Sequence, residues 1–202
     1  MGRHRRAQRA GPTNYALAKL LIEAVTGHSL AEEMQRLILG PLGLSDTVVP
    51  ETSTEIGGPH AHAYYRYDDA GVEKTVDVTS QNPSWISSGG DMISTSKDLH
   101  TFLSALLRGK LLPAPLLAEM LTPEAKVGYG LGVFVQETPS GTVITHNGGH
   151  GGHAALMYST LDGTKTMTAA LNYIDDADLS MSTTFQAATQ RLLDEVFGAA
   201  TA

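Results

Sequence analysis

The last third of the sequence constrains the fold most, because its strand-like segments are joined by turns too short for a crossover. Four runs rich in apolar and β-branched residues occupy 128–137, 142–146, 154–160 and 165–173. TPSG (138–141) joins the first two runs and LDGT (161–164) the last two, and both tetrapeptides are typical of hairpins. Strands joined so closely pair antiparallel. The sequence therefore predicts an antiparallel meander in this region.

Helices are predicted before this meander and after it. One begins after Pro12 and ends at Gly27, and a second starts at the Ser29–Glu32 capping box and is stopped by PLGLSDT. Two more are expected within 94–107 and 114–121, and a last one closes the chain. Four of these helices carry apolar residues at helical spacing. They are Leu17, Leu20, Leu21 and Val25 in the first helix and, expected to be buried, Leu30, Met34, Leu37 and Ile38 in the second. They are Leu99, Phe102, Leu103, Leu106 and Leu107 in the third and, expected to face inward, Leu179, Phe185, Leu192 and Val196 in the last. Segments 60–67 and 74–78 indicate a surface hairpin, so the whole pattern is α+β rather than βαβ.

Composition restricts the class of protein. The 202 residues are 42% hydrophobic and 17% charged, which is typical of a globular domain. A net charge of −7 argues against general affinity for nucleic acid or an anionic membrane. Cysteine is absent, which excludes disulfides and thiolate metal sites, and no apolar run is long enough to span a bilayer.

The chain opens with a basic segment. Its first ten residues carry four arginines and no acid. Residues 1–12 are expected to be a disordered leader before one domain at 13–202. The segment lacks the apolar core of a secretory signal, so the localisation stays undetermined.

The segment HNGGHGGH (146–153) concentrates candidate functional residues. His146, His150 and His153 could supply three nitrogen ligands to zinc. Glycine spacers and the lack of an acidic residue in the segment argue against such a site, because metal ligands need rigid support. The other interpretations are a catalytic loop and an ordinary hairpin turn. The segment alone does not decide between them.

Several motifs together resemble one family. TNYALAKLLIEAVTGHSL, ILGPLGLSDT, SWISSGGDMISTSKDLHTFLSALLRGKLL, GYGLGV and HNG follow the order and spacing of class C β-lactamases and D-alanyl-D-alanine carboxypeptidases. These are penicillin-recognising serine hydrolases. The likeness runs from about Pro12 onward and covers only the C-terminal part of such an enzyme. It implies an incomplete serine β-lactamase/penicillin-binding-protein-like fold of the α+β class.

The resemblance also implies site residues. His146-Asn147-Gly148 matches the family's Lys/His-Thr/Ser-Gly triplet, and Gly149 matches the residue whose N–H forms half of the oxyanion hole. These four are the expected catalytic residues. Trp85, Phe134 and His150 are expected to bind substrate. Phe134 replaces an arginine that often binds a substrate carboxylate, and Asn147 replaces threonine; both changes favour a neutral ester or amide.

The family's proton-moving groups are not found in this sequence. The Ser-x-x-Lys nucleophile motif would lie upstream, and Ala10-Gly11-Pro12 stands where Tyr-x-Asn would be. Ser94-Thr95-Ser96-Lys97 spells Ser-x-x-Lys, but it opens a predicted helix, where Ser and Thr cap the N-terminus and Asp98 favours the first turn. The chain is therefore expected to be inactive alone.

Three functions remain open at this point. The first is a truncated acyl-enzyme-forming hydrolase that acts on a small-molecule or peptidoglycan-like acyl substrate. The second is a non-catalytic binding module of the same fold, and the third is a histidine-based metal protein. No cofactor is expected. A missing N-terminal segment or self-association is expected to cover apolar surface that the shortened fold exposes.

Overall fold

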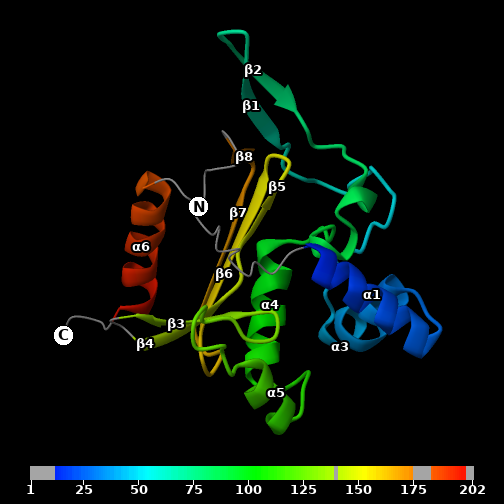
Figure 1. Cartoon of the computed structure of the whole chain (residues 1–202), viewed down its shortest axis with the longest axis vertical. Helices are drawn as coiled ribbons and strands as arrows, with labels where there is room; N and C mark the ends of the chain where they lie inside the picture. The colour runs from blue at the N-terminus through cyan, green and yellow to red at the C-terminus, as the bar shows by residue number, and fades with distance from the viewer. Residues whose placement is uncertain (1–11, 139–140, 175–182, 199–202) are drawn as a thin grey trace, which may run out of the picture.

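The computed structural model describes residues 12–138, 141–174 and 183–198. In chain order its elements are α1 (Pro12–Thr26), α2 (Leu30–Met34), the π-helical turn η1 (Gln35–Leu39), α3 (Gly40–Leu42), β1 (Tyr64–Asp69), β2 (Val72–Asp77), the 3₁₀ turns η2 (Pro83–Trp85) and η3 (Ser87–Gly89), α4 (Ser96–Leu107), α5 (Ala114–Met120), β3 (Phe134–Thr138), β4 (Gly141–Thr145), β5 (Gly148–His150), β6 (His153–Thr160), β7 (Thr166–Leu171), β8 (Tyr173–Ile174) and α6 (Thr183–Phe197). Helices precede an antiparallel sheet and one helix follows it, which confirms the predicted α+β class (Figure 1). Residues 1–11 of the predicted leader lie outside the described residues, and Pro12 is the first residue of α1.

The larger sheet lies between two helices. β6 is its central strand: β7 pairs with one edge, and β4 and β5 share the other, with β3 beyond β4. All of these pairs are antiparallel, as the short turns predict. Helix α6 covers one face and α4 the other (Figure 1). The result is a helix–sheet–helix sandwich.

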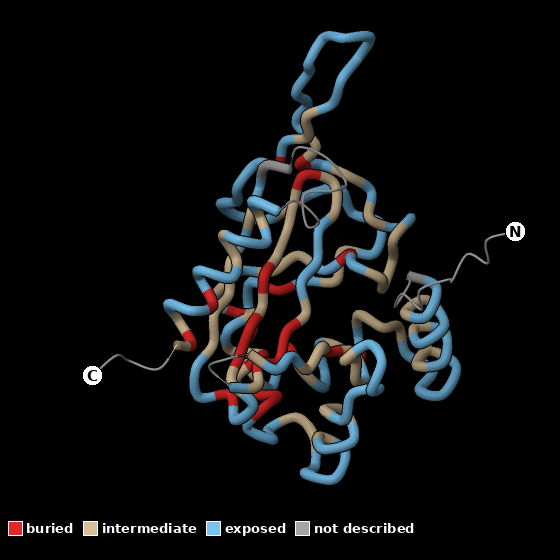
Figure 2. Tube along the Cα trace, turned by 60° about the vertical axis from the view of Figure 1, so that its left-hand side comes forward, coloured by how far each residue is buried: buried red, intermediate tan, exposed pale blue. Residues whose placement is uncertain are grey.

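Both faces of β4 are buried. Val143 belongs to a core cluster with Leu193 and Phe197 of α6. The next residue, Ile144, belongs to a second cluster with Leu103 of α4. Successive side chains of a strand point to opposite faces, so one strand supports both halves of the core. The buried segments in Figure 2 accordingly concentrate along the central strands.

A smaller sheet carries an exposed hairpin. Its order is β2-β1-β8, with β1 and β8 parallel. The turn between β1 and β2 has two residues, Ala70 and Gly71, both with positive φ (54° and 85°), as tight hairpins require. This confirms the predicted hairpin, with a shorter turn than the four residues expected. The hairpin projects from the body and is exposed along most of its length (Figure 2).

The second helix begins and ends as predicted. The Ser29 hydroxyl accepts from the Glu32 N–H, and the Glu32 carboxylate accepts from the Ser29 N–H, so the capping box is present. The segment PLGLSDT ends the helix as predicted, although Pro41 itself still lies within it. The helix widens into the π-helical turn η1, and Pro41 then sits in the first turn of α3, where a helix needs no N–H donor. Gly43, with φ 65°, ends the run.

Some predicted faces and boundaries are wrong. Leu37, expected to be buried in the second helix, is 52% exposed. The first helix, for which no buried face was predicted, leaves its apolar residues Leu17, Leu20, Leu21 and Val25 60–76% exposed. In α6 the inward residue is Leu193, whereas Leu192 is 48% exposed; Phe185 and Val196 pack as expected, and Leu179 lies outside the described residues. The first strand starts at Phe134, because 128–133 turns back on itself, with the Gly130 N–H donating to the Val133 carbonyl at 2.8 Å.

Among the residues with described positions, no helix is both long and apolar enough to cross a membrane.

Candidate active site

The segment 146–153 continues one strand and turns into the next. β4 pairs with β6 up to Thr145–Tyr158, and β5 resumes at Gly148–Ala155 in the same register. The His146 N–H donates to the Met157 carbonyl at 3.3 Å across the gap between β4 and β5. The second edge of β5 has no partner strand among the described residues. The site is therefore an open strand edge.

The register fixes which groups face that edge. The His146 N–H faces β6, where it donates to the Met157 carbonyl, so Gly148 and His150, two and four residues further along the strand, face β6 as well. The intervening residue Gly149 must then direct its N–H and C=O away from β6. Its N–H points to the open edge, which is the orientation that the predicted oxyanion donor needs.

The glycine turn of this segment is in close contact with neighbouring segments. Gly151 and Gly152 form a two-residue turn with φ 50° and 83°. The Gln81 side-chain amide donates to the Gly151 carbonyl at 2.9 Å. A Cβ on Gly152 would lie 2.9 Å from the Tyr64 carbonyl oxygen, so no larger residue fits. The segment 150–153 is thus a tight hairpin turn whose geometry depends on glycine.

Asn147 faces the sheet. Its Oδ1 accepts from the Met157 N–H at 3.1 Å, and its Nδ2 donates to the Tyr158 hydroxyl at 2.5 Å. The Thr145 hydroxyl also donates to Oδ1, at 3.4 Å. The amide of Asn147, one of the four expected catalytic residues, is thus engaged with β6.

An aromatic cluster surrounds His146. Phe134 lies edge-on to Tyr129 with ring centroids 4.6 Å apart, and the His146 ring is 6.1 Å from Phe134 and 6.3 Å from Tyr129. The Tyr15 and Tyr129 hydroxyls lie 2.8 Å apart, which ties α1 to this cluster. Burial, and then the hydrogen bond to Tyr15, raises the pKa of Tyr129, so this phenol stays protonated. Phe134, which stands where the family often has an arginine, is thus part of an aromatic surface beside His146.

A second aromatic contact lies at the other end of β5. The Trp85 and His150 rings meet edge-to-face with centroids 4.6 Å apart, and Trp85 is 68% exposed. Asn82 caps the turn η2 that presents Trp85, because its Oδ1 accepts from the Ser84 N–H at 3.0 Å. Predicted substrate-binding residues thus lie at both ends of the open edge, with Phe134 at one and Trp85 and His150 at the other.

The three histidines of the segment lie in different surroundings. Burial lowers the pKa of each, and the neighbouring His150 and His60 lower that of His153 further. His150 and His153 face each other across the turn, whereas His146 lies beside the aromatic cluster. Within the described ranges, no three His, Asp or Glu residues are arranged to hold a metal ion.

The Ser94–Lys97 segment caps a helix. Thr95 is the N-cap of α4, where its hydroxyl accepts from the Asp98 N–H at 3.1 Å. Ser94 and Thr47 share a hydrogen bond at 2.8 Å, and the Thr47 hydroxyl donates to the buried Asp98 carboxylate at 2.7 Å. The predicted capping role is confirmed.

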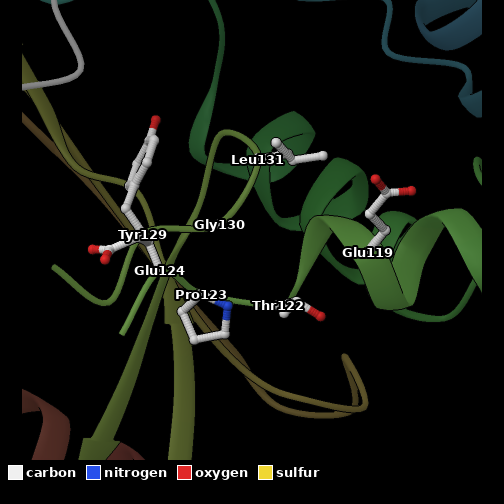
Figure 3. A pocket seen from close by; sticks show the side chains of 7 residues that line it. All are labelled: Glu119, Thr122, Pro123, Glu124, Tyr129, Gly130 and Leu131. Atoms are coloured by element: carbon white, nitrogen blue, oxygen red, sulfur yellow. The ribbon is translucent and has the colours of Figure 1, made fainter. Parts of the chain in front are cut away.

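A shallow pocket lies beside the site (Figure 3). It encloses about 420 Å³ between the end of α5 and the turn before β3, and its lining residues are Glu119, Thr122, Pro123, Glu124, Tyr129, Gly130 and Leu131. Gly130 allows the turn to approach α5, because a Cβ there would lie 2.2 Å from the Met120 carbonyl oxygen. The pocket shares only Tyr129 with the site, and the Tyr129 ring points away from Thr122 (Figure 3).

Sequence reasoning missed four residues that shape the site. They are Tyr15 and Tyr129, which hydrogen-bond to each other, Tyr158, which holds Asn147, and Gln81, which holds the glycine turn. Tyr129 lies in the GYGLGV motif, which was a signal for its importance. Tyr15 likewise lies in the motif TNYALAKLLIEAVTGHSL, whereas Tyr158 and Gln81 lie outside the matching motifs.

Comparison with known proteins gives consistent results. The chain is 25% identical over 183 residues to penicillin-binding protein 4* of Bacillus subtilis (strain 168), covering 82% of this chain and 40% of that protein. It resembles the crystal structure of a D-stereospecific amidohydrolase from Streptomyces sp., with TM-score 0.81, 32% identity and coverage of 96% of this chain and 56% of the other. The D-amino acid amidase from Ochrobactrum anthropi SV3 in complex with D-phenylalanine shares the fold, with TM-score 0.76, 24% identity and coverage of 96% and 60%.

The chain spans less than half the length of the curated relative and somewhat more than half of the two solved structures. The family model described as Beta-lactamase matches residues 11–175, most of the sequence. This match covers the strand edge, both aromatic contacts and the capped helix described above. The chain therefore belongs to the beta-lactamase family of penicillin-recognising serine hydrolases.

Proposed function

We propose that this chain forms the substrate-binding wall of a serine hydrolase site that acts on neutral amides or esters through an acyl-enzyme. The observation that carries the proposal is the open edge of β5, where Gly149 directs its N–H outward. A substrate would lie along this edge as an added strand. Its carbonyl oxygen would accept a hydrogen bond from the Gly149 N–H.

Aromatic groups at both ends of the edge support a neutral substrate. The Phe134 ring lies 6.1 Å from His146, at the position where carboxypeptidases of this family often carry an arginine. An apolar ring gives no hydrogen bond to a carboxylate, which would lose water there without compensation. Exposed Trp85 offers a second apolar surface beside His150. The structural relative from Streptomyces, 32% identical to this chain, is a D-stereospecific amidohydrolase, which also favours an amide substrate.

The nucleophile would come from residues outside these 202. The sequence has one Ser-x-x-Lys, at 94–97, and its serine hydroxyl is hydrogen-bonded to Thr47 beside the N-terminus of α4. A serine elsewhere would attack the substrate carbonyl, pass its proton to a base and expel the leaving group, and water would then release the acyl group. Alone, the chain would bind substrate without turning it over.

Intact-mass spectrometry tests this proposal. The folded chain, checked by circular dichroism, is incubated with benzylpenicillin and separately with a fluorophosphonate probe. No adduct is expected from either. In parallel, D-phenylalanine amide is titrated into ¹⁵N-labelled protein, and the amide signals of Gly148 and Gly149 are expected to shift. A stoichiometric adduct, above all on Ser94, would contradict the external nucleophile, and unmoved signals would contradict the binding wall.

A further inference from the structure

A second cavity lies between α3 and α4, which are side by side in the fold (Figure 1). It encloses about 370 Å³, a volume within the range of small-molecule sites. None of its lining residues belongs to the segment 146–153 or to the aromatic groups at the ends of the open strand edge. The cavity is therefore separate from the candidate active site.

The cavity is electropositive. Arg108 and Lys110 both line it, and none of its lining residues is an aspartate or a glutamate. Neither of these two side chains forms an ion pair with another described residue. Helix α4 ends at Leu107, where its dipole adds roughly half a negative charge. Two full positive charges exceed this amount, although the chain as a whole has a net charge of −7.

The turn between β6 and β7 orients the Arg108 guanidinium. Its Nε donates to the Gly163 carbonyl at 3.3 Å, and the Ser104 hydroxyl donates to the same oxygen at 2.9 Å. Nη1 and Nη2 of Arg108 make no hydrogen bond within the described part of the chain. A guanidinium can bind both oxygens of a planar carboxylate through two such nitrogens. The arginine is thus held at one nitrogen and open at the other two.

Part of the cavity wall is apolar. This apolar wall consists of Pro41 and Leu42 of α3 and of Ala105 of α4, which is buried. The cavity extends along α4 from His100 to Arg108, which corresponds to about 12 Å at the helical rise. A ligand that reaches the cations can therefore also place a short hydrocarbon group along the helix.

We propose that this cavity is a second binding site, which takes a small carboxylate that carries a short apolar group. The carboxylate accepts hydrogen bonds from Nη1 and Nη2 of Arg108 and from the Lys110 ammonium group, and the apolar group lies against the apolar wall. This ligand differs in charge from the neutral substrate proposed for the strand edge. The two sites share no residue, so the second does not depend on the proposed function.

Three probes separate the contributions of charge and apolar surface. Hexanoate has both, hexanamide has the same chain without the charge, and inorganic phosphate has charge without a chain. Each is titrated into ¹⁵N-labelled protein at low ionic strength, which favours charge pairing. Hexanoate is expected to shift the amide signals of Gly109 and Lys110 with a Kd on the order of 1 mM, and to leave Gly149 unmoved.

Hexanamide and phosphate should each bind at least about fivefold more weakly than hexanoate. Hexanamide that binds as tightly as hexanoate would overturn the role of the cations. Phosphate that binds as tightly would overturn the role of the apolar wall. The absence of any hexanoate shift at Gly109 and Lys110 would overturn the site itself.

Charge-neutral variants test the two cations. Arg108→Gln should raise the Kd for hexanoate about tenfold, because it removes the bidentate partner, and Lys110→Gln about threefold. Both side chains are exposed, so both variants should fold. Lys126→Gln is the matched control, since it removes an exposed positive charge outside the cavity and should change the Kd less than twofold. Equal weakening in all three variants would show an effect of net charge alone and would overturn the proposal.

Discussion

The central sheet and helix α1 bury apolar residues to very different extents. Ile144 of β4 is completely buried between the sheet and α4, whereas Leu21 of α1 is 64% exposed. Both belong to regular elements with a clear apolar pattern. The contacts of α1 with the rest of the molecule include polar ones, such as the Tyr15 hydroxyl to Tyr129 and the Ser88 hydroxyl to the Tyr15 carbonyl at 2.9 Å.

An apolar stripe therefore predicts a helix, but it does not predict which part of the molecule packs against that stripe. The stripe of α4 meets the sheet, so its burial stabilises the fold. The stripe of α1 meets solvent in this chain. The free energy of unfolding should therefore depend strongly on the residues buried in the sheet and hardly at all on the outer face of α1. Solubility should depend mainly on the exposed apolar face of α1.

Ile144→Ala should have the largest effect. Removing a buried isoleucine side chain leaves a cavity in the cluster with Leu103 and Val133 and should cost about 3–4 kcal/mol. The measurement is urea unfolding followed by circular dichroism. A loss below about 1 kcal/mol would mean that the sheet is loosely packed, which would abolish the contrast with α1.

Gly152→Ala should come next. The new Cβ would meet the Tyr64 main chain at 2.9 Å, and the residue would keep a φ of 83°, so a loss of about 2–3 kcal/mol is expected. Gly27→Ala is the matched control, because Gly27 has φ 73° with no neighbour within 4 Å and should cost only about 1 kcal/mol. Equal losses would show that the turn is strained but not packed.

The order and type of the elements could be predicted from the sequence, and so could several of their ends. Hairpin turns, the Ser29 capping box and the Thr95 cap are local, because the partners lie within a few residues. The phase of α6 was missed by one residue, since Leu192 and Leu193 are equally apolar and only the sheet decides between them. Tertiary packing, not the local pattern, sets such faces.

The site was predictable in position but not in detail. The resemblance pointed to Gly148 and Gly149, which form part of an open strand edge, and to Phe134 and Trp85, which lie at opposite ends of it. The role of Asn147 depends on Tyr158, eleven residues away across the ladder. No spacing rule connects such a pair until the register is known.

Acidification should lower the stability of the folded chain, by less than the two substitutions above and by more than a substitution on α1. Burial holds the pKa of His146, His150 and His153 below the ordinary value of about 6.5, so protonation favours the unfolded chain. Above about pH 6.5 the imidazoles are neutral in both states and the full stability is present. As the pH falls below that value toward the lower pKa values of the folded state, the unfolded chain takes up protons first and stability is lost. Asp91, whose pKa is raised by burial, acts in the opposite direction.

The melting temperature should therefore fall by several degrees between about pH 7.5 and 5.5. His153→Gln keeps a neutral polar side chain and should reduce this fall. A melting temperature that is constant over this range, or that rises on acidification, would show that these imidazoles are not protected from protonation in the folded chain.

The smallest effect on stability is expected on α1. Leu21→Ser should change the free energy of unfolding by less than about 0.5 kcal/mol beyond its small cost in helix propensity, because the side chain contributes little burial. Replacing Leu17, Leu20, Leu21 and Val25 together by serine should, however, shift the chain toward monomer in sedimentation velocity. Exposed apolar stripes associate, and the four residues lie on a 15-residue helix. A parent chain that is already monomeric at high concentration would contradict the expected self-association. A large loss of stability from Leu21→Ser alone would instead show that α1 packs against the molecule through this face, which would remove the difference between α1 and the sheet.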